Sequence, residues 1–138
     1  MSLLEVKNLS YTYDEGTAFS HDAIVDVNFK VNNGEIIGII GHTGSGKSTL
    51  VSHLNGLIKT EKGKVFVQGE DIWEDPKNIK KFRFLVGLVF QYPEYQLFEE
   101  TAYKDIAYGP TNMGLSDDEI DSRVRMASGM VGLSSNML

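Results

Sequence analysis

The chain has 138 residues, 41% of them hydrophobic and 23% charged, which allows one sizeable core but not two ordinary domains. No stretch approaches the roughly 20 apolar residues of a membrane-spanning helix, and the absence of a secretory signal pattern and of cysteine predicts a cytoplasmic protein. The net charge of −6, without clustered Lys and Arg, argues against a nucleic-acid partner.

The first third of the chain predicts three strands. Residues 3–13 are rich in β-favouring side chains, and residues 24–31 alternate polar and apolar side chains with the period of a half-buried strand. A turn signal at residues 32–34 leads into residues 36–40, which are short, β-branched and uncharged. Such a run is typical of a strand covered on both faces, as in a parallel sheet.

The remaining elements alternate between helices and strands. Glycine-rich residues 41–46 are followed by apolar side chains at helical spacing in residues 47–57. Further along, we expect strands at 64–68 and 85–90 and helices at 76–84, at 99–108 and from Ser116 onward. Ser116 and Glu119 have the spacing of a capping box.

Residues 41–48, GHTGSGKS, match the phosphate-binding pattern G-x-x-x-x-G-K-[ST] without a mismatch and lie between a predicted strand and a predicted helix. The glycines let successive N–H groups form an anion nest at the positive end of the helix. Lys47 would supply a charge for the β- and γ-phosphates, and the Ser48 hydroxyl would be a ligand of Mg²⁺. The predicted nucleotide-contacting residues here are Gly41, Thr43, Gly44, Ser45, Gly46, Lys47, Ser48 and Thr49.

Four side chains allow more than one interpretation: Thr49, His42, His53 and Trp73. The Thr49 hydroxyl either contacts the α-phosphate or bonds its own helix backbone. His42 and His53 have no partner at metal-ligand spacing, and we interpret both as non-catalytic. Trp73 lies in a polar stretch and is interpreted as a packing residue.

The order and spacing of Tyr13, residues 41–48 and Gln91 resemble those of an ABC transporter ATPase. The resemblance implies that Tyr13 stacks on adenine, with Tyr11 as the alternative because it lies on the same strand face. It also implies that Gln91 reaches the Mg²⁺ and the attacking water, which makes Gln91 and Lys47 the expected catalytic residues and Ser48 and Gln91 the expected metal-binding residues. The implied cofactors are ATP and Mg²⁺.

Within that family, residues 90–100 and 109–115 look like those of energy-coupling factor transporters, which import vitamins and transition metals such as cobalt. Residues 11–17 and 41–49 further resemble the second of the two ATPase subunits in heterodimeric members. The implied partners are a second ABC ATPase subunit in a homodimer or heterodimer, a transmembrane energy-coupling protein and a substrate-binding membrane subunit. The implied location is peripheral, at the cytoplasmic face of the membrane.

The chain also departs from that family. It contains no LSGGQ signature, no Walker B strand and no switch histidine, and residues 133–136 do not replace the signature. Residues 1–138 therefore resemble the N-terminal part of one nucleotide-binding domain, expected to bind nucleotide and to hydrolyse it poorly or not at all. The resemblance implies an α/β fold, with a P-loop core of mostly parallel strands, an N-terminal antiparallel β-layer and the start of a helical subdomain.

Other functions remain open to different degrees. A P-loop GTPase or small-molecule kinase is disfavoured because D-x-x-G and N-K-x-D do not occur in residues 49–138. An ABC-type ATPase of DNA repair or translation is disfavoured by residues 92–114 and by the acidic balance. A non-hydrolysing nucleotide-binding interaction module remains an alternative.

The excess of acidic over basic residues lies almost entirely in residues 91–138. We expect this segment to receive a basic coupling helix of the membrane partner, because Leu97 and Phe98 offer an apolar floor beside charged side chains. The acidic residues concerned are Glu94, Glu99, Glu100 and Asp105. The alternative is that Glu99 and Glu100 only open a helix, where the macrodipole favours acids.

Overall fold

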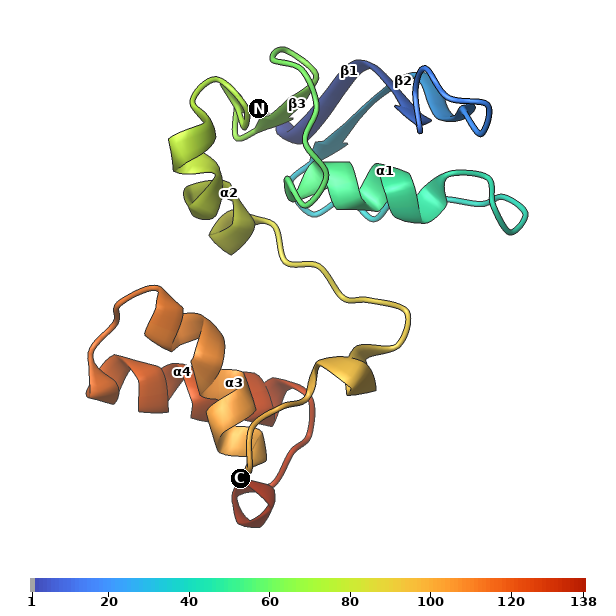
Figure 1. Cartoon of the computed structure of the whole chain (residues 1–138). Helices are drawn as coiled ribbons and strands as arrows, with labels where there is room; N and C mark the ends of the chain where they lie inside the picture. The colour runs from blue at the N-terminus through green and yellow to red at the C-terminus, as the bar shows by residue number, and fades with distance from the viewer. Residues whose placement is uncertain (1) are drawn as a thin grey trace. The chain divides into compact units, whose positions relative to one another are not determined.

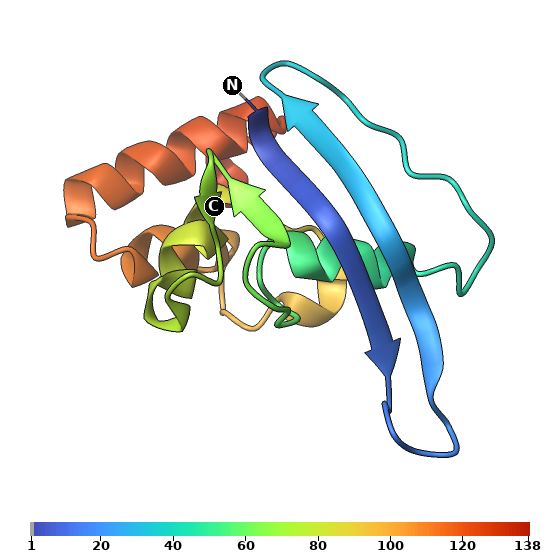
Figure 2. The same ribbon diagram turned by 90° about the horizontal axis from the view of Figure 1, so that it is seen from above.

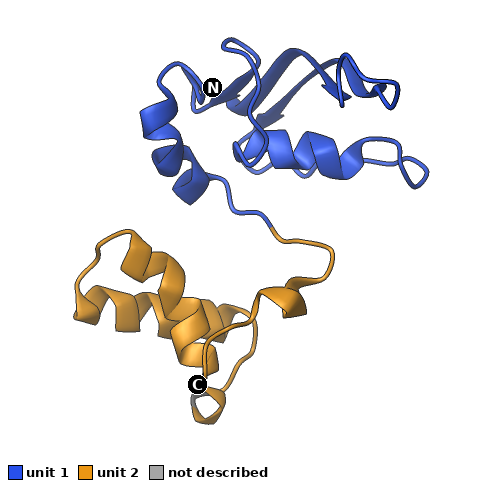
Figure 3. Ribbon diagram, viewed as in Figure 1, with its two compact units in different colours: residues 1–88 blue, residues 89–138 orange. Residues whose placement is uncertain are grey.

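The computed structural model describes residues 2–138 (Figure 1). The chain divides into two units, one ending at Leu88 and the other comprising Val89–Leu138 (Figure 3). The boundary falls inside residues 85–90, where the sequence predicts a strand. Within residues 2–138, no helix has the length and apolar character needed to cross a membrane.

The first unit is built on an antiparallel sheet with strand order β2-β1-β3-β4. Its strands are β1 (Ser2–Tyr13), β2 (His21–Asn32), β3 (Val65–Val67) and β4 (Glu70–Asp71). The long β1–β2 pair crosses over helix α1 (Figure 2). The first three strands confirm the sequence prediction, whereas the two-residue strand β4 was not predicted.

The core of the first unit lies between the sheet and two helices, α1 (Lys47–Leu54) and α2 (Ile79–Leu85). A short 3₁₀ turn, η1 (Pro76–Asn78), precedes α2, and together they occupy the helix predicted at 76–84. The buried side chains of this core are Val6, Leu9, Ile24, Leu50, Val65, Val67, Ile72, Trp73 and Phe82. The prediction that Trp73 packs in the interior is therefore confirmed.

Helix α1 ends three residues earlier than predicted. Asn55 follows Leu54 as the C-cap, and Gly56 adopts a φ of 70°, a left-handed conformation that terminates helices and favours glycine. The last three residues of the predicted helix, 55–57, therefore form a turn and a bend.

Residues 36–40 and 85–90 do not form the strands predicted for them. Residues 36–40 and 86–90 are irregular, and Ile36, Ile40 and Val89 are 97%, 98% and 85% exposed. A strand needs a neighbour for its backbone hydrogen bonds, and no strand within residues 2–138 pairs with either segment. The predicted burial of these two apolar segments is therefore also wrong for the described residues, because no neighbouring strand pairs with them or covers them.

The second unit consists of helices and turns. It contains η2 (Pro93–Gln96), α3 (Ala102–Asn112), α4 (Asp117–Met130) and η3 (Ser135–Met137). Its small core is formed by Ala107, Ile120 and Val124, which join α3 to α4. Helix α4 confirms the helix predicted from Ser116 onward.

The starts of these two helices differ from the prediction in detail. Helix α3 begins at Ala102 rather than at Glu99, because the Thr101 side chain accepts a hydrogen bond from the N–H of Lys104 and so caps the helix. At α4, the Ser116 hydroxyl donates to the Glu119 carboxylate at 3.2 Å and makes no bond to the helix backbone. The capping-box spacing is present, but its reciprocal backbone bonds are not.

Candidate nucleotide-binding site

The phosphate-binding motif forms a loop that runs directly into helix α1. Gly46 precedes the helix with a φ of 84°, and the N–H of Leu50 makes a helical bond to the Gly46 carbonyl at 2.8 Å. The N–H groups of Lys47, Ser48 and Thr49 come before this first bond, so they have no acceptor within the helix. They form the positive end of the helix dipole, as predicted for an anion-binding loop.

The loop is held closely against strand β2. A side chain at Gly46 would collide with the carbonyl oxygen of Ala23, so only glycine allows the loop to lie this near the strand. The contact fixes where the helix N-terminus sits relative to the β1–β2 hairpin.

Lys47 reaches back over its own loop. Its Nζ donates to the carbonyl oxygens of Gly41 and His42 at 2.8 Å each and to the Ser45 hydroxyl at 3.3 Å. The ammonium group is therefore held against polar atoms of its own loop. Three donors on one mobile cation are suited to several phosphate oxygens.

Tyr13 is joined to the loop by a hydrogen bond. Its phenolic oxygen lies 3.1 Å from the Thr49 hydroxyl, a contact that neither sequence interpretation of Thr49 had included. Tyr11 makes an edge contact with Tyr13, with ring centroids 4.9 Å apart, and packs against the core. Of the two tyrosines, Tyr13 is the one that lies beside the loop.

Tyr13 and the loop line a pocket of about 250 Å³, slightly below the volume range of typical small-molecule sites. The lining residues are Tyr13, His21, Ala23, Gly44, Ser45, Gly46, Lys47, Ser48 and Thr49. The structure therefore brings together Tyr13 and six of the eight motif-region residues predicted from the sequence. Gly41 and Thr43 belong to the same loop but do not line the pocket.

The pocket has donors for an anion but no carboxylate of its own. None of its lining residues is Asp or Glu, and residues 2–138 contain no cluster of His, Cys, Asp or Glu able to hold a metal ion alone. Mg²⁺ commonly binds through one or two protein ligands together with substrate phosphates and water. The Ser48 hydroxyl fits that arrangement.

Gln91 belongs to the second unit, where it is exposed and lies two residues before the start of η2. The predicted roles of Gln91 in metal binding and catalysis therefore remain predictions.

Two of the three histidines differ sharply in their surroundings. His42 is exposed in the loop, where its Nδ1 lies 2.8 Å from the Thr43 carbonyl oxygen. His53 is fully buried, its Nδ1 lies 2.7 Å from the Thr49 carbonyl oxygen, and burial lowers its pKa.

Sequence reasoning did not identify His21 or Ala23 as pocket residues, because their position depends on the strand register that pairs Tyr13 with His21.

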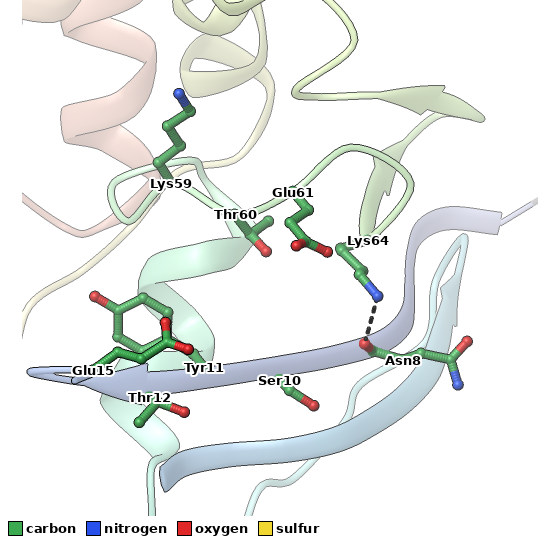
Figure 4. A pocket seen from close by; sticks show the side chains of 9 residues that line it. All are labelled: Asn8, Ser10, Tyr11, Thr12, Glu15, Lys59, Thr60, Glu61 and Lys64. Carbon is green, nitrogen blue, oxygen red and sulfur yellow. Dashed lines mark hydrogen bonds between the residues drawn. The ribbon is translucent and has the colours of Figure 1, made fainter. Parts of the chain in front are cut away.

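A larger cavity, of about 610 Å³, lies elsewhere in the first unit, between strand β1 and the loop that follows α1 (Figure 4). It is lined by both signs of charge, from Glu15 and Glu61 as well as Lys59 and Lys64. The Lys64 ammonium group already donates to the Asn8 carbonyl oxygen at 3.1 Å. This mixture does not favour one class of ligand.

Comparison with protein families gives a match of residues 24–136 to the ABC transporter model. The chain belongs to the ABC transporter family. Among curated relatives of this family, it is 53% identical to the energy-coupling factor transporter ATP-binding protein EcfA2 of Caldanaerobacter subterraneus over 97% of this chain and 47% of the relative. It is 52% identical to the protein of the same name from Clostridium acetobutylicum over 96% of this chain and 46% of the relative.

Two solved ABC structures have the same fold. Cbio1 of Clostridium perfringens, part of the ABC transporter complex cbiONQ, superposes with a TM-score of 0.81 at 36% identity, covering 99% of this chain and 52% of that one. A dimeric ATP-binding cassette in a post-hydrolysis state with ADP and Pi superposes with a TM-score of 0.79 at 26% identity, over 97% and 59%. The predicted family and α/β P-loop fold are confirmed, and the N-terminal antiparallel layer is present. The predicted core of mostly parallel strands is not formed, because every strand pair among the described residues is antiparallel. The chain spans about half the length of the curated relatives it matches.

Proposed function

We propose that this ABC family chain binds ATP with Mg²⁺ on residues 41–48, as the nucleotide-binding part of an ATPase that drives an energy-coupling factor importer. The observation that carries the proposal is the single pocket in which an aromatic ring, Tyr13, adjoins the phosphate-binding loop. Relatives named energy-coupling factor ATP-binding proteins support the transport role. Vitamins or transition metal ions are the proposed cargo.

In this proposal, the loop binds the triphosphate by charge and by directed donors. The Lys47 ammonium group contacts the β- and γ-phosphates, and the first N–H groups of α1 contact the phosphate nearest the helix. The Ser48 hydroxyl binds Mg²⁺, which neutralises charge on the phosphate oxygens when bound. The phenolic oxygen of Tyr13 lies 3.1 Å from the Thr49 hydroxyl oxygen, and the Tyr13 ring is the proposed contact for the base.

The binding proposal is tested by Lys47→Ala. Losing a charge-assisted contact to phosphate costs on the order of 1.5 to 3 kcal/mol, so the affinity for Mg-ATP should fall at least about tenfold. Lys59→Ala removes the same charge from the larger cavity and serves as the control. Calorimetry that gives equal Mg-ATP affinity for the wild type and Lys47→Ala would contradict the proposal.

A second candidate function is a nucleotide-binding module that does not hydrolyse ATP. The lack of a carboxylate among the pocket-lining residues favours it for the 138-residue chain, because ATP hydrolysis requires a group that orients or deprotonates water. Binding would then regulate association with a second ATPase subunit rather than turnover.

For the membrane partner, we propose that the surface around Leu97 and Phe98 docks a basic coupling helix. These side chains are 68% and 63% exposed, and Phe98 packs edge-on against Tyr108 with ring centroids 4.9 Å apart. An apolar patch with acidic neighbours is the composition of a docking site for a basic amphipathic helix. The chain would then lie peripherally at the cytoplasmic face of the membrane.

The acidic side chains of this surface are not equivalent. The Asp105 carboxylate accepts hydrogen bonds from the N–H groups of Phe98 and Glu99 at 3.3 and 3.2 Å, and Glu100 pairs with Lys104 at 3.0 Å. Both have structural roles within the unit. Among the described residues, no ion pair involves Glu94 or Glu99, so these two are the proposed contacts for a basic partner.

A further inference from the structure

The sequence contains the dipeptide Asn-Gly twice, at residues 33–34 and at residues 55–56. In this dipeptide the backbone nitrogen of glycine can attack the side-chain amide of asparagine, because glycine has no Cβ to hinder the approach. The reaction needs an asparagine side chain that is free to rotate and a glycine N–H that is not engaged in a hydrogen bond. The structure gives the two dipeptides different surroundings, and therefore different reactivity.

Asn33 and Gly34 form an exposed turn directly after β2. The hydrogen bonds of this turn are made by the flanking residues. The Glu35 carboxylate accepts from the N–H and the side-chain amide of Asn32 at 2.7 and 3.1 Å, and the Glu35 N–H donates to the Asn32 carbonyl oxygen at 3.2 Å. Within residues 2–138, neither the Asn33 side chain nor the Gly34 N–H makes a hydrogen bond, and a Cβ on Gly34 would have nothing within 4 Å. Both reacting groups are therefore accessible and unengaged.

The same dipeptide at the end of α1 is held by its surroundings. The Gly56 N–H donates to the His53 carbonyl oxygen at 3.1 Å, and the Asn55 side-chain oxygen accepts from the Leu57 N–H at 3.0 Å. Gly56 is buried, and a side chain at this position would collide with Ile79. Both hydrogen bonds must open before the Gly56 nitrogen can attack the Asn55 amide, so the local structure protects this site.

We propose that Asn33 is a site of spontaneous covalent modification, at which the Gly34 nitrogen and water convert the side-chain amide to a carboxylate. The Gly34 nitrogen forms a bond to Cγ of Asn33, the Cγ–Nδ2 bond breaks, and ammonia leaves with the Gly34 amide proton. Water then opens the resulting succinimide ring at either of its two carbonyl carbons. Cleavage of the new Cγ–N bond gives aspartate, and cleavage of the original peptide C–N bond gives isoaspartate. Either product adds a negative charge to a turn that already contains the Glu35 carboxylate.

The test compares the two dipeptides within one folded chain. The 138-residue chain is incubated in mildly alkaline buffer, which favours attack by the glycine nitrogen, and is then cleaved after lysine. This cleavage places Asn33 in the peptide 31–47 and Asn55 in the peptide 48–59, and mass spectrometry measures the conversion of amide to carboxylate in each. Since two hydrogen bonds must open before Asn55 can react, Asn33 should be converted about five- to hundredfold faster. In urea, which removes the folded surroundings, the two sites should react at similar rates.

A variant assigns the modified residue. Asn33→Gln keeps an amide but lengthens the side chain, so the five-membered ring cannot form, and peptide 31–47 should then stay unmodified even though it still contains Asn32. Equal conversion of the two sites in the folded chain, or faster conversion of Asn55, would overturn the proposal. So would a folded chain in which Asn33 stays intact while the urea-treated chain reacts, because the turn would then protect it. The same rate difference in urea as in the folded chain would show that the neighbouring sequence, and not the structure, selects Asn33.

Discussion

At the scale of single residues, Gly46 has the strictest requirement in the site. Its φ of 84° lies in the left-handed region, and its Cα faces the Ala23 carbonyl with no space for a methyl group. The motif predicts a glycine here for phosphate access. The structure adds a second reason, which is the close packing of the loop on β2.

We predict that Gly46→Ala weakens both folding and nucleotide binding. The left-handed conformation alone costs an alanine roughly 1 to 2 kcal/mol, and the collision would also move the loop away from β2. Gly63→Ala is the matched control, because Gly63 has a φ of 77° with open space around it. Urea unfolding should show a larger loss for Gly46→Ala, and calorimetry should show reduced Mg-ATP affinity for that variant alone. Equal effects of the two changes would contradict the packing argument.

His53 predicts a pH dependence of stability. It is fully buried with its Nε2 unpartnered among the described residues, and burial lowers its pKa below the usual histidine value of about 6.5. The unfolded chain then binds more protons, so the free energy of unfolding should fall as pH decreases below about 6.5. The pKa of Glu5 is lowered by a hydrogen bond from Lys30, that of Asp26 by one from Asn8 and that of Asp121 by one from Arg125. Protonation of these three carboxylates destabilises the fold only in more acidic solution.

The measurement is urea unfolding at pH 7.5 and pH 5.5. The wild type should be less stable at the lower pH, and His53→Leu, which cannot titrate, should lose less stability over the same interval. If the wild type and His53→Leu show the same pH dependence of stability, the pKa of His53 does not differ between the folded and unfolded states.

At the scale of elements, the sequence predicted the half-buried strands correctly and the strands covered on both faces wrongly. Residues 3–13, rich in β-favouring side chains, correspond to β1, and residues 24–31, which alternate polar and apolar side chains, correspond to β2. The runs at 36–40 and 85–90 have no such alternation and depend on neighbours on both sides. A strand of this kind cannot be confirmed from its own residues, because its backbone bonds are made by other segments.

The second unit gives a prediction for its exposed acidic residues. In a complete transporter that contains this sequence, Glu94→Lys with Glu99→Lys should impair assembly with the membrane partner, because both would repel a basic helix. Mg-ATP affinity should remain normal, since neither residue lines the nucleotide pocket. Glu61→Lys with Glu74→Lys makes the same charge change on other exposed residues and should assemble normally. Normal assembly and transport by the Glu94 and Glu99 variant would mean that these side chains are only solvated.

At the scale of the whole molecule, binding and hydrolysis should be separable. The pocket has a phosphate-binding loop, a cation and aromatic rings but no carboxylate in its lining. The purified 138-residue chain should therefore bind Mg-ATP and release phosphate at a background rate. Release at an ordinary enzyme rate of around 1 s⁻¹ or above, abolished by Lys47→Ala, would show that these residues suffice for catalysis.

The sequence by itself determined the family and the α/β class, and it predicted the phosphate-binding loop. The loop can be predicted from the sequence because a G-x-x-x-x-G-K-[ST] motif is a short continuous stretch before a helix. Only the tertiary structure decided that Tyr13 bonds to Thr49, that Gly46 packs on Ala23 and that His21 completes the pocket. These contacts join residues far apart in the chain, and their positions follow from strand register and hairpin packing, which no short pattern encodes.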